Sequence, residues 1–215
     1  MNSGSHAQEQ KPGIIRSFLG FVVMIAIVLA ASWGLRTYVI EPFQVPSSSM
    51  EPTIQGHDAS AGVSEVKDMV FAEKLSYRFG TPQRGDIVTF YDPETPSRVL
   101  IKRVIATGGQ TVNLVKDYTD SSGDDHYVVY VDGVKLDEPY VARGSDGKIA
   151  SSSPLMSANG TEISYPYTVP DDCVWVMGDN RENSADSRYF GAVKTSSVFG
   201  RAIAIYWPLQ DIGLL

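Results

Sequence analysis

The chain has 215 residues, a length for one modest domain with an appendage or for two small lobes, which excludes large assemblies and long repeat arrays. Its residues are 43% hydrophobic and 20% charged, so it has enough apolar material to fold around a core. The formal net charge of −7 argues against nucleic-acid binding, which depends on clustered positive charge. The single cysteine, Cys173, excludes an internal disulfide and a cysteine-based zinc site.

An uncharged run of 19 residues, 17–35, lies near the N-terminus. As a helix it would span about 29 Å, close to the thickness of the hydrocarbon core of a bilayer. It exceeds the apolar region of a removable signal peptide, usually about 7–15 residues, so we expect a retained transmembrane helix. A cleaved signal peptide remains the alternative. Lys11 and Arg16 precede the run and only Arg36 closely follows it, which favours a cytoplasmic tail at 1–16 and an external remainder.

A cluster of three serines follows in Pro46-Ser47-Ser48-Ser49-Met50-Glu51-Pro52. Prolines on both sides restrict the backbone, so one hydroxyl could be aimed in advance, although such a segment is also typical of a plain loop. The 14 residues from Leu35 to Ser49 reach at most about 46 Å when extended. If the helix crosses a membrane, these hydroxyls therefore stay close to its surface.

Beyond the apolar run, short β-branched and aromatic segments are cut by Gly, Pro, Asp and Asn, which predicts a mainly β fold. Asp132-Gly133 follows a valine-rich segment and predicts a type I′ hairpin, because both central residues of that turn need a positive φ. The candidate strands are 86–91, 99–107, 127–131, 174–177 and 201–207.

The strand expected at 99–107 contains two adjacent cations, Lys102 and Arg103, among aliphatic residues. Alternation along a strand directs them to opposite faces. Burial of an ammonium group disfavours its charged form and lowers its pKa, which is how a lysine becomes a general base near neutral pH. The alternative is a lysine whose amine reaches solvent from the end of a strand.

The acidic excess lies in 113–172, which has 11 acidic and 4 basic residues. We interpret this stretch as a small solvated β domain inserted into an antiparallel β core formed by 36–112 and 173–215. The Asp-rich segment 120–125 lacks the ligand spacing of a calcium loop and is interpreted as a surface loop. After the insert, the polar segment 177–191 predicts a stiff loop that Asp/Arg pairs could lock and that could support a catalytic group.

The three histidines, His6, His57 and His126, lie in no zinc-binding or Gly-X-Ser-X-Gly motif. A Ser-His-Asp arrangement therefore has no support in the sequence. Nucleotide-binding motifs are also missing, since Gly108-Gly109 alone indicates only a turn. We accordingly expect no cofactor and no metal.

With the apolar run in front of them, four segments resemble, in sequence and in order, the bacterial type I signal peptidases, a family of membrane-anchored serine peptidases with a Ser-Lys dyad. The segments are 46–53, 84–90, 101–105 and 178–188. The resemblance implies an antiparallel β catalytic core with an inserted β domain and one N-terminal transmembrane helix. It further implies removal of signal peptides from exported preproteins at the bacterial cytoplasmic membrane, with the catalytic domain outside.

Carried onto this sequence, the resemblance makes Ser49 the nucleophile and an unprotonated Lys102 the general base. The Ser47 hydroxyl and the Ser49 backbone N–H would form the oxyanion hole. Ser184 would orient the Lys102 amine by a hydrogen bond.

The resemblance also implies support and specificity residues. Asp186 and Arg188 would pair as structural support. Phe43, Val45 and Ile101 would line subsites for the small side chains of an Ala-X-Ala sequence before the cut.

The chain departs from the family at 106–110, Ala-Thr-Gly-Gly-Gln, where Gly-Leu-Pro-Gly-Asp is common, so the resemblance does not give the geometry of this turn. Ser48 also replaces a frequent glycine. Two alternative functions stay open. One is a Ser-Lys peptidase dedicated to one substrate, and the other is a non-enzymatic anchored surface module that uses Arg84-Gly85-Asp86 as an attachment tripeptide.

Overall fold

A computed structural model of the chain describes residues 13–56, 67–144, 147–155 and 163–215. His6, His57 and most of the predicted tail, 1–16, lie outside the described residues. The chain divides into two compact units, Met1–Val39 and Ile40–Leu215.

The first unit contains one helix, α1 (Ile14–Tyr38). Its stretch Arg16–Tyr38 is long and apolar enough to cross a membrane, and its large apolar side chains from Phe18 to Leu35 are exposed. At about 1.5 Å per residue, these 23 residues span about 34 Å. The helix is longer than the predicted 17–35 because a basic residue ends the apolar run without ending the helix, and Arg36 suits a last turn.

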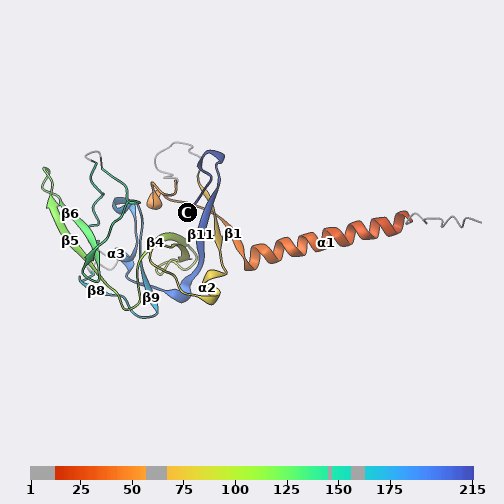
Figure 1. Ribbon diagram of the computed structural model, residues 1–215, viewed down its shortest axis with the longest axis horizontal. Helices are drawn as coiled ribbons and strands as arrows, with labels where there is room; N and C mark the ends of the chain where they lie inside the picture. Colours follow the sequence, from red (N-terminus) through yellow and green to blue (C-terminus); the bar gives the residue numbers. More distant parts are fainter. Residues whose placement is uncertain (1–12, 57–66, 145–146, 156–162) are drawn as a thin grey trace, which may run out of the picture. The chain divides into compact units, whose positions relative to one another are not determined.

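The second unit is built on an eight-stranded antiparallel sheet (Figure 1). Its strand order is β1-β2-β11-β3-β4-β9-β10, and β12 also pairs with β11. These strands are β1 (Ile40–Gln44), β2 (Met69–Glu73), β3 (Ile87–Tyr91), β4 (Val99–Thr107), β9 (Cys173–Met177), β10 (Val193–Lys194), β11 (Val198–Trp207) and β12 (Gly213–Leu214).

A second, four-stranded antiparallel sheet has the order β7-β6-β5-β8 (Figure 1). Its strands are β5 (Thr111–Thr119), β6 (Asp125–Val131), β7 (Val134–Lys135) and β8 (Tyr167–Thr168). The short helices are α2 (Ser76–Phe79), α3 (Ser187–Phe190) and the 3-10 turns η1 (Ser48–Met50), η3 (Arg181–Asn183), η4 (Thr195–Ser197) and η5 (Leu209–Asp211). The predicted fold class, mainly antiparallel β after one apolar helix, is confirmed. The domain boundaries at 113 and 172 stay a prediction.

The predicted strands all exist, with ends shifted by a few residues. The Asp132-Gly133 turn is confirmed, since both residues have a positive φ and the turn joins β6 to β7. Strand β1 was not predicted because it contains Pro42, and β1 tolerates this proline because it lies at the edge of its sheet.

The two sheets share an apolar core. Ile105 of β4 and Trp175 of β9 belong to the same buried cluster as Val112 and Leu114 of β5 and Val129 of β6. Trp175 is completely buried and is the largest side chain of this cluster. Shared hydrophobic packing therefore holds the second sheet against the strands β4 and β9 of the first sheet.

We predict that Trp175→Ala lowers the free energy of unfolding by about 3–5 kcal/mol, because it removes a fully buried aromatic side chain and leaves a cavity. Denaturant unfolding of the full chain in detergent, followed by circular dichroism, measures this change. The matched control is Trp207→Ala, since Trp207 is 44% exposed, and we expect it to cost less than about 1 kcal/mol. Equal losses for the two variants would contradict the shared core.

Candidate active site

Apolar side chains anchor the loop that follows β1. Val45, Met50 and Ile54 are completely buried, and they pack in one cluster with Ile87 of β3 and Ile101 of β4. These anchors lie on both sides of the serine cluster and hold its backbone against the sheet. Burial of such aliphatic groups is the main force that fixes a loop of this kind.

The three serines of this loop differ in their surroundings. Ser47 has an extended backbone and is exposed, and Ser48 is half-buried at the start of η1. Ser49 is only 5% exposed. Of the three serines, Ser49 is therefore the one that is buried.

Gly56 allows the end of this loop to return to its start. A Cβ at Gly56 would lie 1.7 Å from the carbonyl oxygen of Ser47, far inside van der Waals contact. Only glycine permits this approach of two backbone segments. Any larger residue at position 56 would displace the serine cluster.

Lys102 lies in β4 opposite Val88 of β3, and pairing of β4 with β9 begins one residue later, at Arg103 opposite Met177. Lys102 is 2% exposed, which contradicts the alternative of an amine that reaches solvent. Its Nζ lies 2.6 Å from Ser49 Oγ and donates a 3.0 Å hydrogen bond to the Ile101 carbonyl oxygen.

Burial lowers the pKa of Lys102 from 10.5 to about 8, because the ammonium form loses its hydration. The nearby Asp186 carboxylate opposes this shift and raises the pKa, while the Arg98 charge lowers it further. With a pKa of about 8, about a tenth of the molecules carry a neutral amine at pH 7. A neutral amine at this place can accept the proton of Ser49.

A second hydroxyl adjoins Ser49. Ser47 Oγ lies 3.2 Å from Ser49 Oγ, within hydrogen-bond distance. Ser49 Oγ therefore has two polar neighbours, the Lys102 amine and the Ser47 hydroxyl. Chemically, such an arrangement can supply a hydroxyl, an amine that takes its proton and a second hydroxyl that donates a hydrogen bond.

The loop after β9 holds η1 by three hydrogen bonds. The Asn180 backbone N–H donates to the Ser49 carbonyl oxygen over 3.1 Å, and its side-chain Nδ2 donates to the Ser48 carbonyl oxygen over 3.1 Å. Asn183 Nδ2 donates to Ser48 Oγ over 2.8 Å. The backbone on both sides of the Ser49 side chain is thus fixed from a distant part of the sequence.

Gly178 lies between Ser49 and Ser184. A Cβ at this position would come within 2.4 Å of the Ser49 carbonyl oxygen and 2.3 Å of Ser184 Oγ, so the close packing requires glycine. The hydrogen bond from Ser184 to the Lys102 amine that the resemblance implies is not formed here. Ser184 Oγ is buried and makes no hydrogen bond to the Lys102 amine, whereas its proximity to the Asp186 carboxylate contributes to the lowered pKa of Asp186.

A buried ion pair ties β4 to the same loop. Arg103 binds the carboxylate of Asp179 with two hydrogen bonds, 2.9 Å from Nε and 2.6 Å from Nη2. Thr53, next to the buried Ile54, donates a 2.6 Å hydrogen bond to the same carboxylate. Asp179 thus joins β4 to the end of the serine loop, directly beside Lys102.

Asp186 and Arg188 form a second buried pair, with 2.9 Å hydrogen bonds from Arg188 Nε and Nη2 to the two carboxylate oxygens. The Gly178 N–H also donates to Asp186 over 3.0 Å. Burial alone would raise the pKa of Asp186, but the Arg188 charge and these hydrogen bonds lower it below its ordinary value. Asp186 is therefore ionised, and its charge faces Lys102.

The structure brings the predicted subsite residues together. Phe43, Val45 and Ile101 lie in one apolar cluster with Met50, the residue after Ser49. Val45 and Ile101 are closed to solvent, and Phe43 is half-buried. A tightly packed apolar surface thus adjoins the Ser49 turn.

The turn that departs from the family pattern is held by Gln110. Its Oε1 accepts hydrogen bonds from the Thr107 N–H at 3.0 Å and from the Thr107 hydroxyl at 3.1 Å, and its Nε2 donates to Asp132 over 2.8 Å. Gly109 has a φ of 81°, which the turn requires. The glutamine amide therefore closes the turn between β4 and β5.

The tripeptide Arg84-Gly85-Asp86 is tied into the fold. The Asp86 carboxylate accepts 2.9 Å hydrogen bonds from the Tyr77 hydroxyl and from the Gln83 N–H. The Gly85 N–H donates to the Val104 carbonyl oxygen of β4 over 2.8 Å. A carboxylate with these partners does not favour the surface-attachment alternative.

The Asp-rich loop binds its own backbone. Asp120 accepts hydrogen bonds from the N–H groups of Ser122 and Asp124, at 2.8 Å and 3.0 Å. Within the described ranges, no three His, Cys, Asp or Glu side chains are grouped so that they could hold a metal ion. The arrangement is that of a surface loop.

Several residues that hold the site were not predicted as site residues. Asp179, Asn180 and Asn183 lie within the polar segment 177–191, and its Asp and Asn content was the available signal. Arg181 is completely buried and pairs with Glu138, which lies 43 positions earlier in the chain. No local pattern marks Glu138, because its partner is distant in sequence.

The chain is similar to known proteins over nearly its whole length. The family model "Signal peptidase, peptidase S26" matches residues 17–207. A probable signal peptidase I-2 of Synechocystis sp. is 37% identical over 98% of this chain and 82% of its own length. A signal peptidase I of Mycobacterium tuberculosis (strain H37Rv) is 32% identical over 100% of this chain and 81% of its own length.

A crystal structure of a signal peptidase I from Enterococcus faecalis V583 aligns with a TM-score of 0.40 at 35% sequence identity, covering 56% of this chain and 95% of that one. The family model and the two relatives together cover nearly the whole sequence, including both segments that supply Ser49 and Lys102. The chain therefore belongs to the signal peptidase family, peptidase S26, and is a serine endopeptidase.

Proposed function

We propose that this protein removes signal peptides from exported preproteins with a catalytic dyad of Ser49 and Lys102. The observation that carries this proposal is a buried amine 2.6 Å from a buried hydroxyl, with a pKa of about 8. Membership of the signal peptidase family supports the class of substrate. The dyad explains how a serine can be activated where no histidine adjoins it among the described residues.

In the proposed mechanism, the neutral Lys102 amine takes the proton of Ser49 as Ser49 Oγ attacks the scissile carbonyl carbon. The resulting ammonium group then protonates the leaving amine, and an acyl-enzyme remains on Ser49. Water hydrolyses this ester by the same route, with Lys102 again as the base. The Lys102 amine thus accepts and returns every proton that is transferred, and it is neutral at the start and at the end of the cycle.

The tetrahedral intermediate carries a negative oxygen, for which we propose two donors, the Ser47 hydroxyl and the Ser49 N–H. Ser47 is suited to this role because its Oγ lies 3.2 Å from the attacking oxygen. One such donor is typically worth about 2.7–4 kcal/mol in the transition state. We also propose that Ser184, which is buried on the other side of Gly178 from the Ser49 carbonyl oxygen, supports the Lys102 amine.

For specificity, we propose that Phe43, Val45 and Ile101 select small side chains, as in an Ala-X-Ala sequence. This proposal is supported by the apolar cluster of Val45 and Ile101 next to the Ser49 turn, because a substrate side chain bound beside that turn would meet aliphatic groups. An extended substrate presents alternate residues to one side, so two small residues separated by one position would face this surface.

For location, we propose that α1 anchors the protein in the bacterial cytoplasmic membrane by a single crossing, with the N-terminus in the cytoplasm and the catalytic unit outside. The length and apolar surface of α1 support the crossing. Ser49 is 11 residues beyond Tyr38, a reach of at most about 36 Å. The nucleophile would therefore stay near the membrane, where exported signal peptides emerge.

We predict that Ser49→Ala and Lys102→Ala each reduce cleavage of an Ala-X-Ala precursor by about 10⁴-fold or more, because each removes one member of the dyad. Purified full-length protein in detergent, assayed by gel for the processed product, measures this loss. The control is Ser48→Ala, whose hydroxyl contacts Asn183 and not Lys102, and which should keep most of the activity. Substantial turnover by Ser49→Ala would refute the dyad, and cleavage of only one precursor from a panel would indicate the dedicated peptidase.

We predict that kcat/KM rises with pH and levels off above an apparent pKa of about 8, because only the neutral form of Lys102 accepts the proton of Ser49. Initial rates at subsaturating substrate between about pH 5 and 10 test this. A rate independent of pH across this range would exclude a lysine base.

We predict that Lys102→Met stabilises the protein at pH 7. The folded-state pKa of Lys102 lies below the unfolded value of 10.5, so protonation at pH 7 costs the wild type about 3 kcal/mol. This cost disappears as pH rises from about 8 to 10.5, because the unfolded state binds more protons in this window. The free energy of unfolding of both proteins, measured at pH 7 and pH 10, should therefore differ less at pH 10 than at pH 7. An equal difference at the two pH values would contradict burial of the charged amine.

A further inference from the structure

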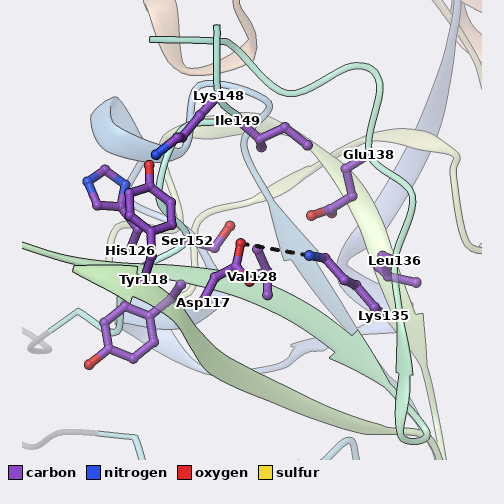
Figure 2. A pocket seen from close by; sticks show the side chains of 11 residues that line it. Asp117, Tyr118, His126, Val128, Lys135, Leu136, Glu138, Lys148, Ile149 and Ser152 are labelled. Carbon is purple, nitrogen blue, oxygen red and sulfur yellow. Dashed lines mark ion pairs between the residues drawn. The ribbon is translucent and has the colours of Figure 1, made fainter. Parts of the chain in front are cut away.

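Glu138 connects the second sheet with the loop 178–188, which packs against the Ser49 turn and is called the catalytic loop below. It follows β7 and lines a pocket of about 260 Å³ beside the second sheet, together with Asp117, Lys135 and Ser152 (Figure 2). The figure shows Asp117 and Lys135 facing each other across part of this pocket, while Glu138 lies apart from them. The side chain of Glu138 is only 5% exposed, so its carboxylate has a partner within the protein.

That partner is Arg181 in η3, whose side chain is completely buried. Two hydrogen bonds join them, 2.5 Å from Arg181 Nη2 to Glu138 Oε1 and 3.1 Å from Nη1 to Oε2. A bidentate arginine–carboxylate pair fixes direction as well as distance. Ser152 accepts a further 2.5 Å hydrogen bond from Arg181 Nη1.

The other contacts of Arg181 lead to the nucleophile. Arg181 Nε donates to the Gly178 carbonyl oxygen over 3.0 Å, and Gly178 packs against the Ser49 carbonyl oxygen. The Arg181 carbonyl oxygen accepts a 2.7 Å hydrogen bond from Arg188 Nη2, and Arg188 pairs with Asp186. Between Gly178 and Arg181 lies Asn180, whose N–H holds the Ser49 carbonyl oxygen.

The segment after Glu138 makes two more contacts with the same region. The guanidinium carbon of Arg103 lies 4.1 Å from the centre of the Tyr140 ring, and the Tyr140 hydroxyl donates to Glu138 over 3.1 Å. The Ala142 N–H donates to the Asp179 carbonyl oxygen over 3.3 Å. Residues 138–142 thus pack against the catalytic loop, and Glu138 contributes the ion pair with Arg181.

We propose that Glu138 is a positioning residue for catalysis, which acts through Arg181 to hold the loop 178–188 against the Ser49 turn. This inference rests on the proposed function and extends it to a residue outside the eight-stranded sheet that carries Lys102. Because the reacting atoms must keep their distance and direction within narrow limits, a small displacement of this loop slows the chemical step. Substrate binding, which uses the apolar surface at Val45 and Ile101, depends less on Glu138.

The first test compares Glu138→Gln with Asp117→Asn, using the full-length enzyme in detergent and an Ala-X-Ala precursor peptide. Both changes remove one carboxylate charge next to the same pocket. Asp117, however, pairs with Lys135 in an exposed position, where the side chain of Asp117 is 47% exposed and that of Lys135 is 49% exposed. We expect Glu138→Gln to lower kcat by about 10–100-fold with KM changed by less than about twofold. Asp117→Asn should leave both constants unchanged. Wild-type kcat in Glu138→Gln would overturn the proposal.

A second variant separates positioning from stability, because Glu138→Gln also leaves a buried Arg181 charge without its partner. In Glu138→Leu/Arg181→Met both charges are replaced by apolar groups of similar volume, which often restores stability. We expect a Tm close to that of the wild type but a kcat that stays at least about 10-fold lower, since the Gly178 carbonyl oxygen has lost its donor. Recovery of kcat together with Tm would show that Glu138 serves stability alone and would overturn the proposal.

Assays of the wild-type enzyme and of Ser49→Ala under the same conditions separate a failure of the proposed function from a failure of the positioning role of Glu138. Cleavage by the wild type that is lost in Ser49→Ala supports the proposed function and provides the reference for every kcat ratio. Cleavage that persists in Ser49→Ala would overturn the proposed function itself. A dyad that works normally together with a fully active Glu138→Gln would overturn the positioning role alone.

Discussion

The burial of one amine beside one hydroxyl is the constraint on which the rest of the structure depends. The Lys102 amine is withdrawn from water and lies 2.6 Å from Ser49 Oγ. Desolvation that lowers its pKa from 10.5 to about 8 costs about 3 kcal/mol at neutral pH, a large share of the stability of a domain of this size. The sheet must therefore hold Lys102 firmly, and β4 can do so because β3 and β9 pair with it on both sides.

Three arginines near this amine each have a carboxylate partner, whereas the amine itself has none among the described residues. Arg103, Arg181 and Arg188 pair with Asp179, Glu138 and Asp186, and each carboxylate accepts two hydrogen bonds from its arginine. Among the described residues, Lys102 forms no ion pair with a carboxylate, and its hydrogen bonds go to neutral oxygens. A lysine amine changes its pKa readily when it is buried, and the burial of Lys102 lowers its pKa to about 8.

The sequence predicted those parts of the site that depend on local pattern. Alternation along β4 marked Lys102 as a candidate and the flanking prolines marked the serine cluster, whereas only the resemblance to the signal peptidases singled out Ser49; the Asp-Gly turn marked a hairpin. Strand β1 was missed because local propensity disfavours Pro42, whereas its edge position tolerates that residue. The pairing of Glu138 with Arg181 could not be predicted, because 43 positions separate two residues whose contact depends on how one sheet packs on the other. The need for glycine at positions 56 and 178 could not be predicted either. Each glycine is required by backbone atoms of a residue that is not its neighbour in sequence, Ser47 for Gly56 and Ser49 for Gly178.

The second sheet is connected to the site in two physically different ways. Its apolar side chains share a core with Ile105 of β4 and Trp175 of β9, the strands that carry Lys102 and lead into the catalytic loop. Its connecting segment also places Glu138 against Arg181. Apolar packing tolerates small shifts, whereas a bidentate ion pair fixes direction, so the core sets where the second sheet lies and the ion pair sets how the loop is oriented. The carboxylate of Glu138 differs from the exposed acidic groups of the second sheet, such as Asp117, because it is buried and paired with Arg181.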